Sequence, residues 1–252
     1  MARKRRRAIG GLAVAVGIAA SGLQAPAFGA SDDLEIALNL ANMLRAARAV
    51  ISSNQALIND PSVGDKQLTG KVVVEKAIVG YQEVTHKSPE KIDPSSREGR
   101  LLSAQLAAIA EVMDENQDTI NMKGVGFKGF VPAVFARLVN ERFEEKVGDQ
   151  AHIKVTAPPG LIRNRKARPD SWETELIETK LMSPDWPAGQ MVWAEAKSSG
   201  REAFRVMVPE YYTQGCLSCH GEPKGEIDIT GYPKEGGKLN DLGGVISVAL
   251  YR

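Results

Sequence analysis

Hydrophobic and polar positions follow two different periods along the chain, and the change comes near its middle. In the first half, apolar residues such as Ile36, Leu40 and Met43 recur every three or four positions, as on one face of an α-helix. The segments that show this spacing are residues 33–58, 71–84, 98–118 and 132–148. Four helices are therefore predicted, with breaks at the Gly- and Pro-containing stretch 59–65 and the Gly-rich stretch 123–129.

The second half contains short segments rich in β-branched and aromatic residues, bounded by Gly, Pro or charge. They cover residues 152–157, 189–196, 201–209 and 243–252. Phe204, Val206 and Val208 fall on one face of the third segment. Arg205 and Met207 fall on the other face. Helices followed by strands predict an α+β fold with an antiparallel sheet.

The first 30 residues have the layout of a secretory signal peptide. Five basic residues at positions 3–7 precede an apolar run from Ala8 to Leu23, and small residues follow. The apolar run is shorter than the roughly 20 residues of a membrane-spanning helix, although an uncleaved anchor is the alternative interpretation. We expect cleavage between Ala27 and Ser31. Residues 31–252 should then form a single domain that is exported to the periplasm, soluble and without a stable membrane span.

Removal of this leader changes the charge of the chain. The whole sequence has 32 basic and 31 acidic residues, and the leader contains five basic and no acidic ones. The remainder therefore has a net charge of about −4. A nucleic-acid partner is not expected, because nucleic-acid-binding domains carry a basic excess.

Both cysteines of the chain lie in one stretch, "YYTQGCLSCHGEPKGE". Cys216 and Cys219 are separated by two residues, and His220 follows directly. A thioredoxin-like dithiol would follow a βαβ unit, which is not predicted here. A structural zinc site needs four ligands, so the distant His86 and His152 would have to converge on this segment. A disulfide between the two cysteines would close too short a loop to stabilise the chain much.

The pattern C-x-x-C-H is the attachment motif of c-type haem and uses all three residues. Cys216 and Cys219 would each form a thioether with one vinyl group, and His220 would be the proximal iron ligand. Export fits this interpretation, because bacterial haem c is attached outside the cytoplasm. The sequence therefore predicts one covalently bound haem c, held in a loop rich in glycine.

The second axial ligand is less well defined by the sequence. Met43 on the first helix is the leading candidate for the distal position, although a methionine more often fills space in a core. The other candidate methionines and histidines are Met113, Met122, Met191, Met207, His86 and His152.

The basic stretch "RNRKARPDSWE" has two interpretations. Arg163 and Arg165 are candidate contacts for the haem propionates, because arginine binds carboxylates with a two-pronged hydrogen-bond fork. Lys166 and Arg168 share the stretch. The alternative is a solvated charge run before a helix that begins at Pro169 and Asp170. Trp172, in that helix, is expected in the core.

The chain resembles a family of exported monohaem c-type cytochromes with a PAS-like fold, usually catalogued as a haem-binding domain of unknown function. The resemblance covers about residues 32–252. It is carried by "LINDPSVGDKQLT", "FKGFVPAVFARLVNERF", "APPGLIRNRKARPDSWE", "CLSCHGEP" and "GYPKEGGKLNDLGGVISVAL". It implies a central antiparallel sheet, a long N-terminal helix with flanking helices, and haem held against the sheet. A member of this family has a cysteine of the N-terminal helix as second haem ligand, and this chain has no third cysteine.

The expected function is redox sensing or electron transfer by a periplasmic monohaem cytochrome. Its partner would be a redox protein or, in the alternative of a gas-binding sensor module, a small gas ligand. A peroxidase-type enzyme is the least favoured interpretation, because the sequence offers no recognisable distal acid–base pair. We therefore expect a haem protein that is not a catalyst.

Overall fold

The computed structural model of the protein describes residues 28–252. The expected signal peptide covers residues 1–30, and residues 1–27 lie outside this description. In the described part, no helix combines the length and the hydropathy that a membrane span requires.

The first half of the chain is helical, as the apolar spacing predicts. Its helices are α1 (Phe28–Ser53), α2 (Gln55–Ile58), α3 (Gly70–Thr85), α4 (Arg97–Glu115), α5 (Gln117–Ile120) and α6 (Pro132–Val147), with 3-10 turns at Pro89–Lys91 and Gly148–Gln150. The hydroxyls of Thr69 and Ser96 cap α3 and α4 by accepting a backbone N–H of the first turn. The first predicted helix is divided at Asn54, whose amide side chain donates to the carbonyl of Val50.

The second half forms a four-stranded antiparallel sheet in the order β1-β4-β3-β2. Its strands are β1 (Ala151–Thr156), β2 (Val192–Ser198), β3 (Arg201–Tyr211) and β4 (Leu242–Tyr251). Between β1 and β2 lie two 3-10 turns (Pro159–Leu161 and Arg165–Ala167), α7 (Ser171–Leu176) and a π-turn (Ile177–Leu181), and α8 (Leu217–His220) follows β3. The prediction of an α+β fold with an antiparallel sheet is confirmed.

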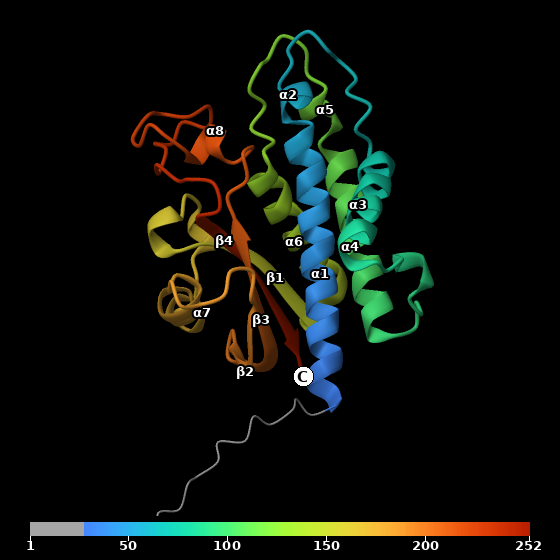
Figure 1. The fold of residues 1–252 in the computed structure, drawn as a ribbon. Coiled ribbons are helices and arrows are strands. Elements are labelled where there is room, and N and C mark those ends of the chain that lie inside the picture. Colours follow the sequence, from blue (N-terminus) through green and yellow to red (C-terminus); the bar gives the residue numbers. More distant parts are fainter. Residues whose placement is uncertain (1–27) are drawn as a thin grey trace, which may run out of the picture.

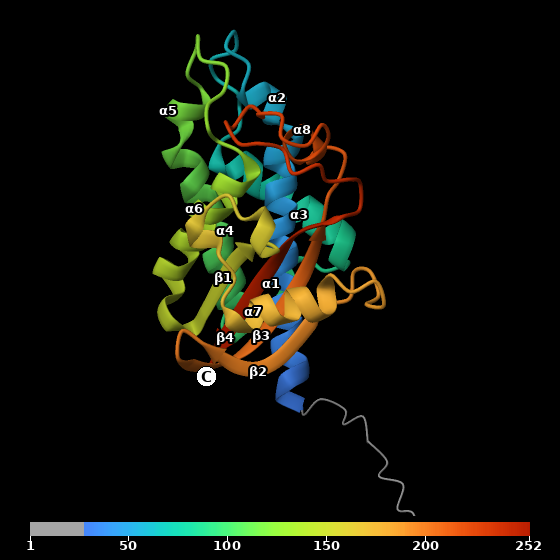
Figure 2. The ribbon, with the colours of Figure 1, turned by 90° about the vertical axis from the view of Figure 1, so that its left-hand side faces the viewer.

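Helices cover both faces of the sheet, and the apolar cluster on one face is larger than the cluster on the other. Helices α1 and α6 pack against one face, with α3 and α4 behind them (Figures 1 and 2). The main core joins side chains of these helices with Phe204, Val206 and Val208 of β3. On the opposite face, α7 and the π-turn cover a smaller cluster that contains Met207. The two faces predicted for β3 are therefore confirmed.

Helix α7 begins at Ser171, next to the predicted start, and Trp172 is half-buried at the edge of the smaller cluster rather than enclosed in the core. Asp170 caps α7, and Glu173 closes a capping box with it. Trp172 packs against the smaller cluster, with the Arg205 guanidinium 4.2 Å from its ring centroid. These contacts place Trp172 among apolar side chains of the sheet's second face.

Candidate functional site

The C-x-x-C-H segment forms one helical turn shortly after β3, one of the two inner strands of the sheet. The carbonyl of Cys216 accepts the backbone N–H groups of Cys219 (3.2 Å) and His220 (3.0 Å). Both cysteines are free thiols and half-buried. The side chains of Cys216, Cys219 and His220 therefore all project from a single helical turn.

His220 is held by contacts to its ring from two residues. Its Nδ1 lies 2.8 Å from Oε2 of Glu235, and its ring stacks on Tyr212 with centroids 5.1 Å apart and planes at 18°. When Glu235 is ionised, Nδ1 carries the hydrogen and donates it to the carboxylate. The lone pair of the ring is then on Nε2, so Nε2 is the atom that can bind a metal.

Glu235 is itself fixed by Arg163 through a two-pronged interaction. Nε and Nη2 of Arg163 donate to Oε1 and Oε2 of Glu235 at 2.7 and 2.9 Å. Burial alone would raise the pKa of Glu235. The hydrogen bonds from Arg163 and His220 outweigh burial and hold that pKa below its usual value.

The remaining donors of Arg163 bind two other parts of the same loop. Nη1 donates to Oδ2 of Asp228 at 2.6 Å, and Nη2 also donates to the carbonyl of Cys219 at 2.9 Å. The Asp228 side chain is fully buried. Its burial would raise its pKa, but hydrogen bonds from Thr230 and Arg163 hold the pKa far below its usual value. Arg163 thus connects the haem-motif turn with the loop that follows it.

Two glycines make the space in which the Tyr212 ring lies beside His220. A Cβ atom added at Gly243 would meet the ring at 2.3 Å, and one at Gly237 would meet it at 2.5 Å. The Tyr212 hydroxyl is buried and has no hydrogen-bond partner within residues 28–252. Burial, reinforced by the charge of Glu235, raises the pKa of Tyr212 to about 12, so the phenol stays neutral.

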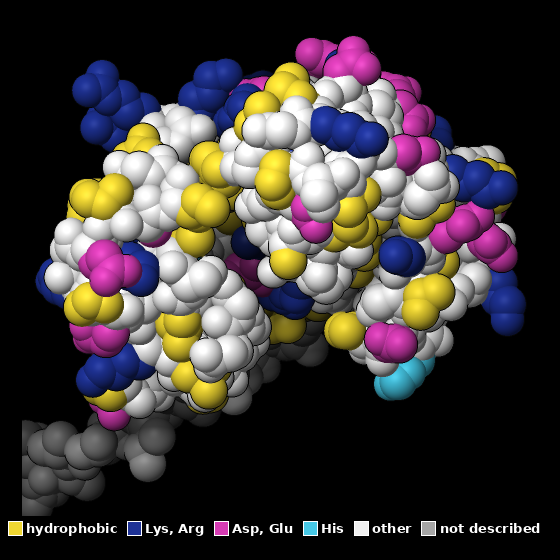
Figure 3. Space-filling view, turned by 90° about the horizontal axis from the view of Figure 1, so that it is seen from above, with side chains coloured by type: hydrophobic (Ala, Val, Ile, Leu, Met, Phe, Trp, Pro, Cys, Tyr) yellow, Lys and Arg dark blue, Asp and Glu magenta, His cyan; other side chains and the backbone are white. Residues whose placement is uncertain are grey.

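The C-terminal half of α1 lies opposite α8 across a hollow. Arg45 and Arg48 of α1 both pair with Glu210 near the end of β3, the former at 2.6 Å. Ser52 lies one turn further on, close to Gly215 at the start of the haem-motif turn. The upper face of the molecule is hollowed between the part that carries α8 and the helical layer, and basic and acidic side chains lie in this hollow (Figure 3).

The two arginines that are predicted to contact the haem propionates differ from each other in their surroundings. Arg163 lies at the site, but its donors are used by Glu235, Asp228 and a backbone carbonyl. Arg165 borders an open cavity of about 490 Å³ next to Arg163, and it makes no ion pair within the described part of the chain. Arg165 therefore remains available to an anion, whereas Arg163 holds the loop together.

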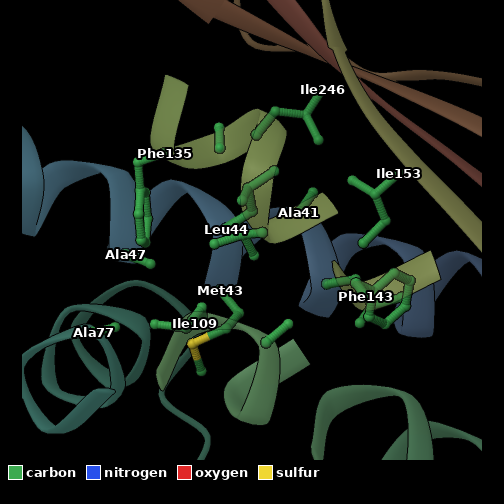
Figure 4. Packing of buried hydrophobic residues seen from close by; sticks show 14 of the residues in the cluster. Ala41, Met43, Leu44, Ala47, Ala77, Ile109, Phe135, Phe143, Ile153 and Ile246 are labelled. Carbon is green, nitrogen blue, oxygen red and sulfur yellow. The ribbon is translucent and has the colours of Figure 1, made fainter. Parts of the chain in front are cut away.

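Met43 is not brought to the haem motif. It is fully buried in the main core, near Ile109 of α4 and Ala77 of α3 (Figure 4). Arg45 and Arg48 point from another face of α1 toward the end of β3. Met43 thus faces the helical layer, on the side of α1 away from α8.

The other candidate iron ligands lie on separate elements. Met113 and Met207 are buried in the two apolar clusters, whereas Met122 is 49% exposed and Met191 packs at the edge of the main core. His86 ends α3, and His152 on β1 lies 3.3 Å from Glu144. In the part of the chain that the structure describes, no three His, Cys, Asp or Glu side chains converge as a metal site. The convergence that a zinc site would need is therefore not seen there.

Sequence reasoning missed three residues that organise the site. Asp228 and Glu235 reach Arg163 and His220 only through the path of the loop after α8, whereas Tyr212 lies between β3 and α8 and reaches His220 through the turn that joins them. No local motif marks any of the three. The one signal was the concentration of glycine in this loop, which indicated close packing of the backbone but not the side chain that it accommodates.

Comparison with known proteins gives a match at the level of the family. Neither a curated protein nor a solved structure matches the chain significantly. The model of the Tll0287-like family (Tll0287) matches residues 34–250, which is almost the whole described chain. The protein therefore belongs to the Tll0287-like family, a cytochrome-like haem-binding family.

Proposed function

We propose that the protein is a periplasmic monohaem c-type cytochrome that transfers electrons or reports redox state. Cys216 and Cys219 hold the haem covalently, and His220 ligates its iron through Nε2. When bound, the haem supplies a ferric/ferrous couple for one-electron transfer. The protein acts in this proposal as an electron carrier or sensor and not as a catalyst.

The observation that carries the proposal is the state of the three motif side chains. Both thiols are free and half-buried, and the Glu235 hydrogen bond leaves Nε2 of His220 available. Each thiol would add across one vinyl group, with sulfur bonding one carbon and the thiol hydrogen going to the other. This addition needs no oxidant, but it needs reduced thiols.

Basic side chains of α1 near the end of β3 support a place for the haem propionates. Arg45 and Arg48 line the α1 side near Glu210, and Nε of Arg48 is buried without a partner among residues 28–252. Guanidinium groups pair well with carboxylates such as the haem propionates. Arg45 and Arg48, which a propionate would share with Glu210, are one pair of proposed propionate contacts. Arg165, which borders the separate cavity beside Arg163, is the other proposed contact.

Covalent attachment can be tested by expression with a cytochrome c maturation system. The wild-type protein should keep its haem through denaturing electrophoresis and stain for it. Cys216→Ser and Cys219→Ser should each leave one thioether, and the double variant should lose the covalent haem. A wild-type protein that carries no covalent haem under these conditions would refute the proposal.

A gas-binding sensor is the second candidate, because the α1 side of the hollow offers no usual iron ligand. Arg45, Arg48 and Ser52 lie there, and the only methionine of that helix faces the core. Uptake of carbon monoxide by the ferrous protein separates the two functions. A five-coordinate form that binds the gas supports sensing, and a six-coordinate form indifferent to it supports electron transfer.

Two further parts of the proposal concern location and fold type. Export to the periplasm is supported by the order of basic, apolar and small residues in positions 1–30. A PAS-like architecture is supported by the antiparallel sheet and by the long α1 that packs against it.

A further inference from the structure

We propose that Glu235 is a positioning residue that lowers the reduction potential of the haem by polarising His220. Arg163 and Asp228 act with it as one charged cluster. The inference rests on the proposed function, because it concerns the iron that His220 would bind. It goes further by predicting which oxidation state the protein favours.

The first step of the argument is the direction of the hydrogen bond at His220. Nδ1 donates to a carboxylate oxygen at 2.8 Å, and the two-pronged interaction with Arg163 fixes that carboxylate in orientation. A carboxylate acceptor draws the Nδ1 proton and makes Nε2 a stronger electron donor. Stronger donation stabilises ferric iron more than ferrous iron.

The second step is the net charge of the cluster. Arg163 contributes one positive charge, and Glu235 and Asp228 contribute two negative charges. Their side chains are 18%, 15% and 0% exposed, so solvent screens them only in part. One negative charge therefore remains uncompensated beside His220.

The third step compares this charge with the two states of the haem. Reduction adds one electron from an external donor, so the charge of the iron centre falls by one. A neighbouring net negative charge favours the more positive ferric state. Both the hydrogen bond and the net charge therefore act in the same direction and lower the potential.

The Tyr212 ring keeps the imidazole in the orientation that this hydrogen bond needs. The ring is fixed between Gly237 and Gly243, and the backbone N–H of Gly237 donates to the carbonyl of His220 at 2.7 Å. Packing of Tyr212 on a face of the imidazole thus helps to set the geometry of the Glu235 contact, which is made at the ring edge. Tyr212 contributes no charge, because its phenol stays protonated.

The test compares reduction potentials of holo-proteins that carry covalent haem. Glu235→Gln retains an oxygen acceptor but removes the charge. We expect its ferric-to-ferrous ratio at a fixed ambient potential to fall at least tenfold, which is a positive shift of about 59 mV for one electron. Glu226→Gln is the matched control, because Glu226 pairs with Lys234 on the same loop and does not touch His220. Its potential should equal that of the wild type.

A second variant, Asp228→Asn, changes the cluster charge without touching His220. It should shift the reduction potential in the same direction by a smaller amount. If Glu235→Gln does not fold, the potential of Asp228→Asn alone tests the inference. Unchanged or lower potentials in the folded, haem-bearing variants would overturn the inference. Absence of covalent haem from the wild type would instead overturn the proposed function.

Discussion

At the scale of single residues, neighbouring positions of α1 have opposite surroundings. Met43 is fully buried among apolar side chains, whereas Arg45 and Arg48 reach across to Glu210 near the haem motif. The direction of each side chain follows from its angle around the helix axis, at about 3.6 residues per turn. A residue can therefore lie on the expected helix and still be turned away from the site.

Replacement of Met43 by alanine tests this placement. We expect Met43→Ala to lower the free energy of unfolding by about 2–5 kcal/mol, because it opens a cavity in a packed core. The haem absorption spectrum should not change. Met122→Ala is the control, because Met122 is 49% exposed and its loss should leave both stability and spectrum as they are. A changed spectrum in folded Met43→Ala would show that the thioether does reach the iron.

At the scale of elements, α7 shows how a six-residue helix is held on the outer face of the sheet. Asp170 accepts the backbone N–H of Glu173 at 2.9 Å, and Glu173 accepts that of Asp170 at 2.8 Å. Nη2 of the buried Arg205 in β3 donates to Asp170 at 2.7 Å. Burial raises the pKa of Asp170, but these hydrogen bonds outweigh it and hold the pKa below the usual 3.8.

The Asp170 cap makes stability depend on pH in a defined direction. A carboxylate with a depressed pKa stabilises the fold above its unfolded pKa of 3.8, and this contribution is lost as the pH falls through the lower folded value. Asp170→Ala should cost about 1–2 kcal/mol at neutral pH through loss of the cap. Asp170→Asn should keep the cap and lose only the charge.

Urea unfolding at neutral pH and at steps below pH 3.8 checks this expectation. The difference between wild type and Asp170→Asn should be present at neutral pH and shrink as the solution becomes more acidic. A difference that stays the same at every pH would mean that the Asp170 charge contributes nothing.

At the scale of the whole molecule, the haem motif follows β3, an inner strand of the sheet that is buried on both faces along most of its length. Because β3 ends one residue before Tyr212, a change that destabilises this strand should also displace the haem motif. The chain that precedes α1 has a different role in our proposal, which is to direct export.

Processing of the N-terminus can be measured directly on the secreted protein. We expect mass spectrometry to find a mature chain that begins between residues 28 and 31, because small residues suitable for cleavage lie there. The protein should be recovered in the periplasmic fraction without detergent. An intact Met1 on membrane-bound protein would contradict this expectation.

Much of the fold could be predicted from local pattern. The strand segments around Phe204 and Val248 were visible because apolar alternation reports a buried face directly. The capped start of α7 was visible because Asp170 follows proline before a helical stretch. The π-turn after α7 was not predicted, because its backbone depends on packing over Met207 and Val245 rather than on residue type.

The site could be predicted only where it is continuous in sequence. Cys216, Cys219 and His220 form one motif, so their chemistry can be read without a fold. Glu235 lies 15 residues from His220, and Arg163 lies 56 residues from Cys219. Arg163 was predicted to contact the haem propionates, whereas the carboxylates that it binds in the structure are those of Glu235 and Asp228.

The pairing of Arg45 and Arg48 with Glu210 has a mechanical consequence. A helix of 26 residues such as α1 is a stiff rod roughly 39 Å long. One end of this rod is tied to Glu210, two residues before Tyr212, and the other end is tied through Asp33 to Arg97 and to Arg252 at the end of the chain. A displacement of the β3 end would therefore be transmitted along the rod to the opposite pole of the molecule, with little loss by bending.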